Sequence, residues 1–501
     1  MTILDKNLAA IRLKQPEIAE SLQGARIGTA YKGLTTAKTG EPIPIFASGQ
    51  ALQSLYNPVR EAERAAAALS AGFMLFCGLG NGTNAKIFLD KYPQSCCAIT
   101  ESDYESFKQL LSLIDYTTLL SDNRVFLLPP CTAASFESAL TAAYLPAVHG
   151  TFGYHILRPW NEYYKVQLKD LPQQIEHALE KIKADFSVQV HFGKIWLRNI
   201  FLNLRLAGSI VPEYPQTDTT RTALILGAGP GLGEGLELLK KYRQRYTLFC
   251  TDTAFPVVCA HGMTPEFFIA LDPQHISYQH TIGAIPKGTT GIFDLSAETS
   301  GARRFYENGN AFFFTSGGHP LVQAAAFFSP FPPLPTESGT VAIAAYHAAQ
   351  ALGYRHIECS GMDFAYTDGK AYAQGTYLSA QFAGNAARTC PQEHSFARLM
   401  FRTETYNERT KKGITYRTPL LDSYRAAFEA EKYCNIRWQH TDFKQFPYTA
   451  FLETFIRRLK QNERNTVTSL FPALAWCKTH RKENFTDMEL VSELISRYTG
   501  T

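Results

Sequence analysis

The sequence has no C-x-x-C pair, and its ten cysteines are scattered over 501 residues. This spacing argues against a disulfide framework and against a zinc site, so we expect reduced thiols and no metal ligands. No apolar run reaches the roughly 18 residues that a membrane helix needs, and the charged N-terminus is unlike a signal peptide. No run of lysine or arginine stands out in a chain of net charge +4. We therefore expect a cytoplasmic protein without membrane insertion and without nucleic acid as a partner.

With 45% hydrophobic and 19% charged side chains, the chain is long enough for two or three hydrophobic cores. Prolines and threonines in IVPEYPQTDTTRT mark a linker, and residues 374–418 are polar. We predict an α/β protein with four parts. These are an N-terminal Rossmann-like domain (1–130), a largely helical connector (131–215), a central Rossmann-like domain with a parallel sheet (216–420) and a C-terminal helical region (421–501).

The most informative stretch is residues 222–255, which has the pattern strand, glycine loop, helix, strand. Gly227, Gly229 and Gly231 crowd the loop and Pro230 stiffens it. Such a loop lets backbone approach a phosphate, and the N-terminus of the following helix favours an anion. Glycines also simply close turns between strands and helices, so the loop alone does not decide between these interpretations.

After residue 221 the pattern alternates strand and helix, which predicts a parallel sheet covered on both faces. Strands are expected at 223–226, 247–250, 267–271, 291–295, 311–315 and 356–360. Ligands of such sheets bind at the carboxyl ends of strands, where polar residues of this sequence collect. These are Asp252, Asp272, Ser316 with Gly317, and Asp363. Ser338 is the expected N-cap of the helix that precedes the last strand.

A second glycine loop, with Gly78, Gly80 and Gly82, follows an apolar run in the N-terminal part. Glu101 lies just past the next expected strand, where a Rossmann-like sheet commonly places a ribose-binding acid. A methyltransferase has this pattern. Only one further strand, at 125–128, follows before helical segments take over. We therefore interpret this unit as structural and expect no methyltransferase activity.

Residues 337–372 resemble the bacterial sialyltransferases that cap lipooligosaccharides. Glu337-Ser338-Gly339 stands where that family has a Thr-Ser-Gly turn, and residues 351–354 (ALGY) end the helix as in that family. Residues 360–364 (SGMDF) match its Ser-Gly-Ile-Asp-Phe strand end, and Tyr372 follows Gly369 at its three-residue spacing.

Most of the chain resembles the motility-associated factor (Maf) glycosyltransferases, which are thought to place nonulosonic acids on flagellin. The resemblance includes YNPVREAER, FGKIWLRNIFLNL, GAGPGLG, PEFFIALDP and GMDFAYTDGKAYA. Other relatives of the central domain are MptE-like hydroxymethylpterin diphosphokinases. The chain departs from the sialyltransferases at Ala228 and Asp252, where that family has asparagine.

The resemblance implies roles for particular residues. Tyr372 and Tyr366 would donate hydrogen bonds to the departing phosphate, and Ser338, Gly339 and Thr340 would hold the nucleotide. His394, which precedes a serine, stands where the sialyltransferase base is expected; His319, in TSGGHP, is the rival base or a helix cap. The remaining donor-binding residues that we expect are Gly227, Ala228, Gly229, Pro230, Gly231, Asp252, Asp272, Ser316, Gly317, Gly361 and Asp363.

The first functional hypothesis is a glycosyltransferase that moves a nonulosonic acid, such as pseudaminic or legionaminic acid, from a CMP donor to flagellin hydroxyls. No cofactor is required, and a divalent metal is dispensable because the leaving group is a single phosphate diester. The second is an ATP-dependent hydroxymethylpterin diphosphokinase, which needs magnesium on carboxylates such as Asp252, Asp272 and Asp363. The third is a non-catalytic flagellin-binding protein.

Overall fold

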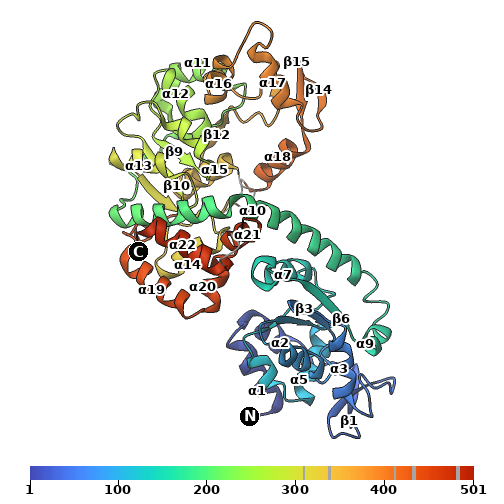
Figure 1. Cartoon of the computed structure of the whole chain (residues 1–501). Helices are drawn as coiled ribbons and strands as arrows, with labels where there is room; N and C mark the ends of the chain where they lie inside the picture. The colour runs from blue at the N-terminus through green and yellow to red at the C-terminus, as the bar shows by residue number, and fades with distance from the viewer. Residues whose placement is uncertain (309–310, 337–339, 411–412, 432–435, 481–485, 501) are drawn as a thin grey trace. The chain divides into compact units, whose positions relative to one another are not determined.

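The computed structural model describes residues 1–308, 311–336, 340–410, 413–431, 436–480 and 486–500. The chain forms two compact units, Met1–His191 and Phe192–Thr501 (Figure 1). One long helix, α10 (Leu171–Ser209), runs through the boundary between them. No helix in the described part of the chain combines the length and the apolar character needed to cross a bilayer.

The N-terminal unit is built on a four-stranded parallel sheet in the order β5-β4-β3-β6. Its strands are β3 (Phe73–Cys77), β4 (Cys96–Thr100), β5 (Val125–Leu127) and β6 (Phe152–Ile156). The strand β6 lies within the segment after residue 131 that the sequence predicts to be largely helical. Its side chains are half-buried without clear alternation, so pairing with β3, rather than a local pattern, makes it a strand.

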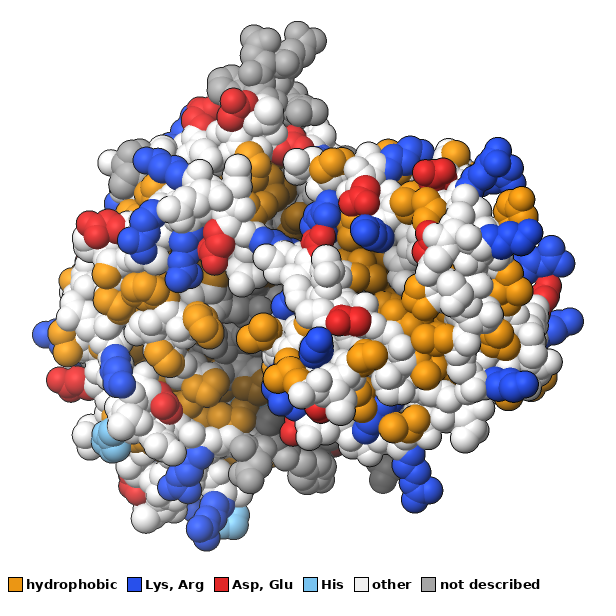
Figure 2. Space-filling model, turned by 90° about the horizontal axis from the view of Figure 1, so that it is seen from below, with side chains coloured by type: hydrophobic (Ala, Val, Ile, Leu, Met, Phe, Trp, Pro, Cys, Tyr) orange, Lys and Arg blue, Asp and Glu red, His pale blue; other side chains and the backbone are white. Residues whose placement is uncertain are grey.

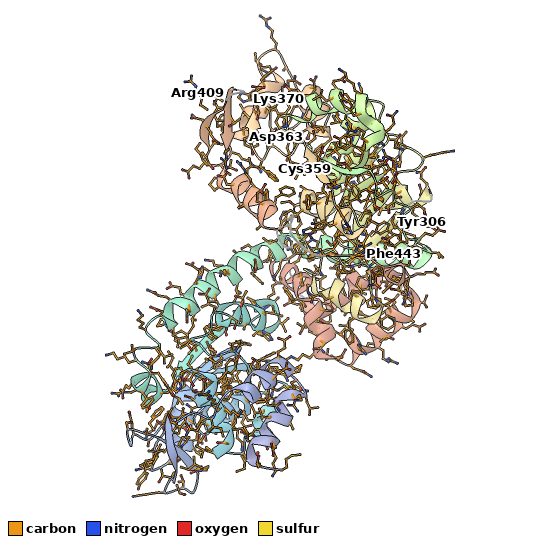
Figure 3. All side chains as sticks on the ribbon, turned by 180° about the vertical axis from the view of Figure 1, so that it is seen from behind. Tyr306, Cys359, Asp363, Lys370, Arg409 and Phe443 are labelled. Atoms are coloured by element: carbon orange, nitrogen blue, oxygen red, sulfur yellow. The ribbon has the colours of Figure 1, made fainter. Side chains whose placement is uncertain are left out.

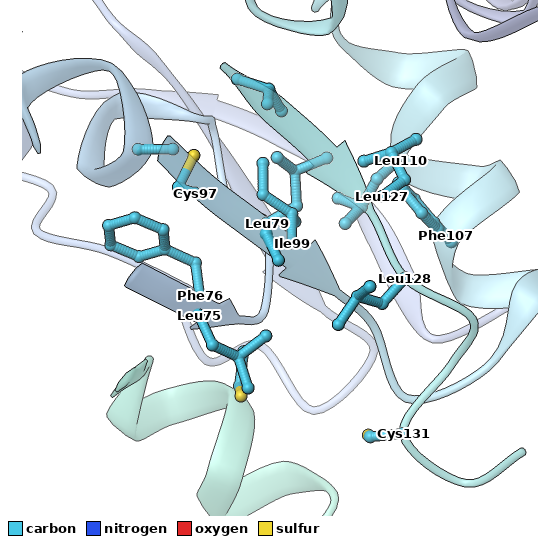
Figure 4. Packing of buried hydrophobic residues seen from close by; sticks show 14 of the residues in the cluster. Leu75, Phe76, Leu79, Cys97, Ile99, Phe107, Leu110, Leu127, Leu128 and Cys131 are labelled. Atoms are coloured by element: carbon cyan, nitrogen blue, oxygen red, sulfur yellow. The ribbon is translucent and has the colours of Figure 1, made fainter. Parts of the chain in front are cut away.

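Helices surround this sheet, and a small antiparallel hairpin precedes it. The helices are α1 (Ile3–Arg12), α2 (Pro16–Gly24), α3 (Pro58–Ala67), α4 (Thr83–Lys91), α5 (Tyr104–Leu113), α6 (Thr117–Ser121), α7 (Phe136–Ala143), α8 (Pro146–His149) and α9 (Arg158–Tyr163), and the hairpin joins β1 (Tyr31–Thr36) and β2 (Pro42–Phe46). Figure 4 shows the core between sheet and helices, where Leu75, Ile99 and Leu127 of three strands pack with Phe107 and Leu110 of α5.

The N-terminal glycine loop, with Gly78, Gly80 and Gly82, is filled by the protein's own side chains. Glu101 is fully buried; one of its carboxylate oxygens accepts the Leu79 N–H at 2.6 Å and the other accepts the Trp160 indole N–H at 2.7 Å. A Cβ at Gly78 would lie 2.9 Å from the Trp160 ring. The acid that a cofactor's ribose would need is thus engaged in internal hydrogen bonds, which supports the structural interpretation of this loop.

Glu101→Gln should flatten the pH dependence of stability between about pH 4.5 and 7. Burial raises the pKa of Glu101 to about 7, so the folded state keeps a proton there that the unfolded chain has released. The free energy of unfolding therefore falls as pH rises through this window. Between pH 5 and 7 we expect the wild type to lose about 2 kcal/mol more than the variant. Urea unfolding at both pH values measures this difference in the free energy of unfolding. Equal losses in the wild type and in Glu101→Gln would show that other groups cause the pH dependence. Glu105→Gln is the control, because Glu105 is exposed.

The second unit holds a six-stranded, wholly parallel sheet in the order β11-β10-β9-β8-β7-β12. All six predicted strands are confirmed: β7 (Thr222–Leu226), β8 (Tyr246–Thr251), β9 (Phe267–Ala270), β10 (Thr290–Asp294), β11 (Ala311–Phe314) and β12 (Ile357–Ser360). The inner strands are almost entirely buried on both faces, as expected for a sheet covered on both sides. The predicted α/β class is confirmed.

Helices cover the two faces of this sheet. On one face, Ile225, Phe249 and Ile292 pack against the alanine-rich α15 (Val341–Ala351) and Trp438. Near the other face are α11 (Leu232–Tyr242), α12 (Phe255–Ala260) and α13 (Thr299–Glu307), where Phe268 stacks on Phe305. The second half of α10 contributes two buried amides: Asn199 donates to the carbonyls of Pro273 and Ser296, and Asn203 to those of Leu295 and Ala297. These bonds fix the loops that follow β9 and β10.

The polar segment 374–418 is more structured than its composition predicts. It contains α16 (Tyr377–Gly384), α17 (Gln392–Met400), β14 (Tyr406–Thr410) and β15 (Gly413–Arg417), and the two strands join β13 (Tyr366–Thr367) in an antiparallel sheet of order β13-β15-β14. Figure 1 shows α16, α17 and this small sheet in orange beside the parallel sheet.

Helices dominate the C-terminal part, as predicted. They are α18 (Pro419–Glu431), α19 (Tyr448–Lys460), α20 (Arg464–Ser469), α21 (Phe471–Thr479) and α22 (Asp487–Thr499), and α14 (Pro320–Phe328) packs on α20. Phe455 of α19 contacts Phe201 of α10, with ring centroids 5.7 Å apart. On the face shown in Figure 2, basic and acidic side chains are interspersed.

Candidate active site

The strand order places a cavity at the switch point of the parallel sheet. The chain moves from β7 to β8 on one side, and β12 later joins on the other side of β7. Loops after β7 and β12 therefore diverge, and this geometry is the usual ligand site of open α/β sheets. A cavity of about 610 Å³ lies there, lined by residues that follow β7, β8 and β12 and by the start of α15.

Two glycine turns face each other at the base of the cavity. Gly229 donates its N–H to the Gly361 carbonyl at 2.8 Å, and Gly227 donates to the Ser360 carbonyl at 2.9 Å. Gly361 has φ +69°, and a Cβ there would lie 2.2 Å from the Gly227 carbonyl oxygen. Both turns need glycine because backbone packs on backbone.

Gly361→Ala should destabilise the C-terminal unit by more than about 3 kcal/mol. The left-handed conformation alone costs about 1–2 kcal/mol for a residue with a Cβ. The added Cβ would also meet the fixed backbone of Gly227. Gly369→Ala is the matched control, because Gly369 has φ +68° but open space around its Cβ position. Thermal unfolding should show a small loss for Gly369→Ala and a several-fold larger loss for Gly361→Ala; similar losses would refute the contact argument.

Asp363 occupies the position where a glycine loop would hold a phosphate. The Gly231 N–H, at the start of α11, donates to an Asp363 carboxylate oxygen at 3.2 Å, and a Cβ at Gly229 would lie 2.0 Å from that oxygen. Figure 3 labels Asp363 beyond Cys359 of β12. A carboxylate of the protein therefore meets the positive end of the α11 dipole. A donor phosphate has to find its partners elsewhere in the cavity.

Such partners lie on another wall, formed by Tyr366, Tyr372 and Arg402, which we call the anion wall. Burial raises the pKa of Tyr372 to about 12 and also raises that of Tyr366, while the Arg402 charge acts in the opposite direction on both. Both hydroxyls therefore carry a proton at neutral pH and can donate it in a hydrogen bond. Among the described residues, Arg402 has no ion-pair or hydrogen-bond partner. An arginine without a partner, beside two phenol hydroxyls that can donate hydrogen bonds, is suited to bind an anionic ligand.

The anion wall is fixed by contacts to the glycine turn and to α17. The N–H of Ala373, next to Tyr372, donates to the Ala228 carbonyl at 2.9 Å. Tyr366 and Tyr372 pack against a small apolar cluster of Ala371, Phe396 and Met400. Phe364, which also lines the cavity, has φ +45°, an uncommon conformation for an aromatic residue. Backbone strain of this kind clusters at functional sites.

Asp252 also lines the cavity, just after β8, and only 4% of its surface is exposed. One carboxylate oxygen accepts the Thr253 N–H at 2.6 Å and the Thr253 hydroxyl at 3.0 Å. Burial raises the pKa of Asp252, nearby His280 and the hydrogen bonds from Thr253 lower it, and Asp272 raises it further.

The cavity brings together many of the residues predicted from the sequence. It is lined by Gly227, Ala228, Gly229, Asp252, Thr340, Gly361, Asp363, Tyr366 and Tyr372. Thr340, rather than Ser338, is the N-cap of α15, since its hydroxyl accepts the Ile343 N–H. Ser338 and Gly339 lie outside the described residues. Pro230, Gly231, Asp272, Ser316, Gly317, His319 and His394 do not line the cavity.

His319 is a helix cap in the structure. Its Nδ1 accepts the Leu321 N–H at the start of α14, and its ring meets Trp196 edge-on at 5.4 Å. Burial lowers the pKa of His319 to about 3. His319, Ser316 and Gly317 all follow β11, which is four strand positions from β7, a distance of about 19 Å. These residues therefore lie at the edge of the sheet that is far from the cavity.

His394 and Asp272 lie nearer to the cavity but outside its lining. His394 is exposed in the first turn of α17, whose buried side packs on the tyrosine cluster through Phe396. Asp272 follows β9 and accepts the Gln274 N–H at 2.8 Å, as a turn residue does.

The residues that sequence analysis missed come mostly from the polar segment and its junction with α18. They are Arg402, Thr403, Glu404, Thr418, Leu421 and Tyr424. No local pattern singles out one arginine among many polar residues; only the folding of this segment over the sheet does so. Among the described residues, no group of three or more His, Cys, Asp or Glu side chains is placed to hold a metal ion.

Comparison with known protein families matches residues 195–369 to the family described as 6-hydroxymethylpterin diphosphokinase MptE-like, which confirms the expected resemblance of the central domain. An uncharacterised protein of Treponema pallidum (strain Nichols) is 40% identical over 273 residues, which is 52% of this chain and 98% of that protein. A second one from the same organism is 44% identical over 167 residues, which is 33% of this chain and 80% of that protein. Among solved structures, the MAf glycosyltransferase from Magnetospirillum magneticum AMB-1 is 15% identical with a TM-score of 0.49, over 99% of this chain and 90% of that one.

Proposed function

We propose that this chain, which belongs to the same family as the uncharacterised Treponema pallidum proteins, is a glycosyltransferase that uses a CMP-activated nonulosonic acid. Its acceptors are serine or threonine hydroxyls of a protein, with flagellin as the expected partner, and it acts in the cytoplasm. The observation that carries the proposal is the anion wall, in which Arg402 stands without a partner among the described residues beside Tyr366 and Tyr372.

The charges of the cavity suit a nucleotide that carries one phosphate. Asp252, Asp363 and Glu404 are its carboxylates and Arg402 is its one Lys or Arg side chain among the described lining residues. Asp363 lies by the glycine turns, where its carboxylate can accept hydrogen bonds from ribose hydroxyls or a base amino group. The phosphate then lies against the anion wall, away from the carboxylate of Asp363.

Transfer breaks the bond between the anomeric carbon and a phosphate oxygen, and the electron pair goes to the phosphate. Charge grows on that oxygen as the bond breaks, so hydrogen bonds that strengthen at this moment accelerate the step. The Tyr372 and Tyr366 hydroxyls are protonated donors at neutral pH, and Arg402 adds a full positive charge. A monoanionic diester needs less neutralisation than a triphosphate, so the proposal includes neither a metal nor another cofactor.

A second function is favoured by the family match over residues 195–369, whose description names a 6-hydroxymethylpterin diphosphokinase. In that case the cavity would take ATP with magnesium, and Asp252 and Asp363 would be the available carboxylates.

Calorimetry with CMP, CTP and ATP, each with EDTA or with magnesium, separates the two functions. The glycosyltransferase proposal expects CMP to bind in EDTA and ATP to bind weakly in both conditions. Magnesium-dependent binding of ATP without binding of CMP would favour the diphosphokinase. Incubation with a CMP-nonulosonic acid and flagellin then tests transfer, which appears as a mass increase of the acceptor equal to one bound sugar. Binding of CMP without transfer to flagellin would support the CMP-activated donor but would show that flagellin is not the acceptor.

A further inference from the structure

A buried histidine that the sequence analysis did not single out lies behind Asp252. His280 is the second-last residue of the 3₁₀ segment η3 (His275–Thr281), which packs against η2 (Asp252–Ala254). Only 5% of its surface is exposed, and its Nδ1 is buried without a hydrogen-bond partner. The ring meets Tyr377 edge-on at 5.0 Å. A buried imidazole nitrogen without a partner is costly, which calls for an explanation.

The electrostatic surroundings link His280 to the cavity through Asp252. Besides the hydrogen bonds from Thr253, the titratable groups that act on or respond to Asp252 are His280 from η3, Asp272 after β9, Cys250 of β8, and Tyr372 and Tyr377 from the segment around α16. Of these, His280 is the one that favours the ionised carboxylate. Asp272 and burial favour the neutral acid. Arg304, which donates to the Thr281 carbonyl, holds η3 against α13.

We propose that Asp252 is the general base that accepts the proton of the acceptor hydroxyl, and that His280 is the positioning residue that keeps its carboxylate ionised. This inference rests on the proposed glycosyl transfer. Asp252 lines the cavity, and one carboxylate oxygen is anchored by Thr253. The other oxygen is available for the reaction.

In this step the acceptor oxygen forms a bond to the anomeric carbon while its proton moves to the Asp252 carboxylate. The bond between the anomeric carbon and the phosphate oxygen breaks, and CMP leaves with the electron pair. Protonated Asp252 then returns its proton to water. Burial brings the pKa of the carboxyl closer to neutral pH, where a general base works best, and His280 prevents it from staying protonated.

Asp252→Asn is the first test, with CMP and a CMP-nonulosonic acid as probes. We expect kcat of transfer to fall by about 10² to 10⁴, the usual contribution of a positioned base, and Kd for CMP to change by less than about threefold. Asp294→Asn is the matched control, because Asp294 is also a buried aspartate at a strand end but lies outside the cavity lining. Weaker CMP binding with kcat intact would make Asp252 a nucleotide ligand and would overturn the proposal, as would unchanged kinetics.

His280→Phe and His280→Gln test the positioning role. The phenylalanine keeps the ring packing on Tyr377 but cannot carry a charge. The acidic limb of the pH–rate profile should therefore move to higher pH in both variants, because glutamine carries no charge either, with Kd for CMP unchanged. A uniform loss of rate at every pH in both variants would show a merely structural role.

A readout that needs no turnover completes the test. Carboxyl ¹³C NMR of aspartate-labelled protein, assigned with Asp252→Asn, should show a higher pKa of Asp252 in His280→Phe than in the wild type, because the lowering effect of His280 is removed. An equal pKa would overturn the role of His280 whether or not the right acceptor has been found. Failure of the wild type to bind CMP would instead defeat the proposed function. If His394→Ala abolishes transfer while Asp252→Asn does not, the base is the histidine that the sialyltransferase resemblance implies.

Discussion

Tyr372→Phe should slow glycosyl transfer by about 10²-fold while leaving the affinity for the intact CMP-nonulosonic acid nearly unchanged. The substitution removes one hydroxyl from the anion wall and keeps the ring, which packs on Ala371, Phe396 and Met400. The hydroxyl matters most when the phosphate departs, because charge grows on the leaving oxygen only then. Burial keeps this hydroxyl protonated, with a pKa of about 12, so at neutral pH it acts as a donor. Single-turnover rates, and calorimetry with the CMP-nonulosonic acid in the absence of acceptor, measure the two quantities separately.

Tyr416→Phe is the control for this substitution. Tyr416 lies in β15, pairs with Tyr366 of β13 and does not line the cavity. Loss of the Tyr416 hydroxyl should leave both the rate of transfer and the Kd of the donor unchanged. If Tyr372→Phe weakens binding of the intact CMP-nonulosonic acid as much as it slows transfer, the hydroxyl contacts the ground state equally well and contributes no selective stabilisation of the transition state.

The sequence was sufficient to predict the parallel sheet and one side of its ligand site. The six strands are short apolar runs separated by helical patterns, and periodicity of this kind can be recognised without knowledge of the packing partners. Because carboxyl ends of parallel strands share one edge of a sheet, the positions of Gly227, Asp252 and Asp363 along the chain were enough to place them together. The family match to the MptE-like domain covers this same region.

The other side of the site depends on contacts between distant segments, which a local pattern does not encode. β6 is a strand because it pairs with β3, and the small sheet forms because β15 pairs with both β13 and β14. Asp363 illustrates the same limit: its spacing after β12 predicts a place in the cavity, but not that it bonds to the Gly231 N–H. The glycine neighbours of His319 suggest a rival base, whereas its packing on Trp196 makes it a helix cap.

Arg402→Gln should weaken CMP binding by about tenfold to a hundredfold, which corresponds to the loss of one charge-assisted hydrogen bond. Arg402 is the cation of the anion wall and has no ion-pair partner among the described residues, so its charge is available to a ligand. Cytidine, which lacks the phosphate, should bind the wild type and the variant equally. The difference in binding free energy between CMP and cytidine should be smaller in the variant than in the wild type, and added salt should also reduce it.

Arg398→Gln provides the matched charge control, because Arg398 is exposed in α17, four residues earlier, and does not line the cavity. It should leave the affinity for CMP unchanged. Arg402→Lys separates charge from geometry: lysine keeps the charge but lacks the planar fork, so an intermediate affinity points to a two-pronged contact with phosphate oxygens. If Arg402→Gln binds CMP like the wild type but binds the complete CMP-sugar more weakly, the arginine contacts the carboxylate of the nonulosonic acid. The tyrosine hydroxyls alone would then hold the phosphate, and the effect of Tyr372→Phe would have to exceed that of Arg402→Gln on the rate of transfer.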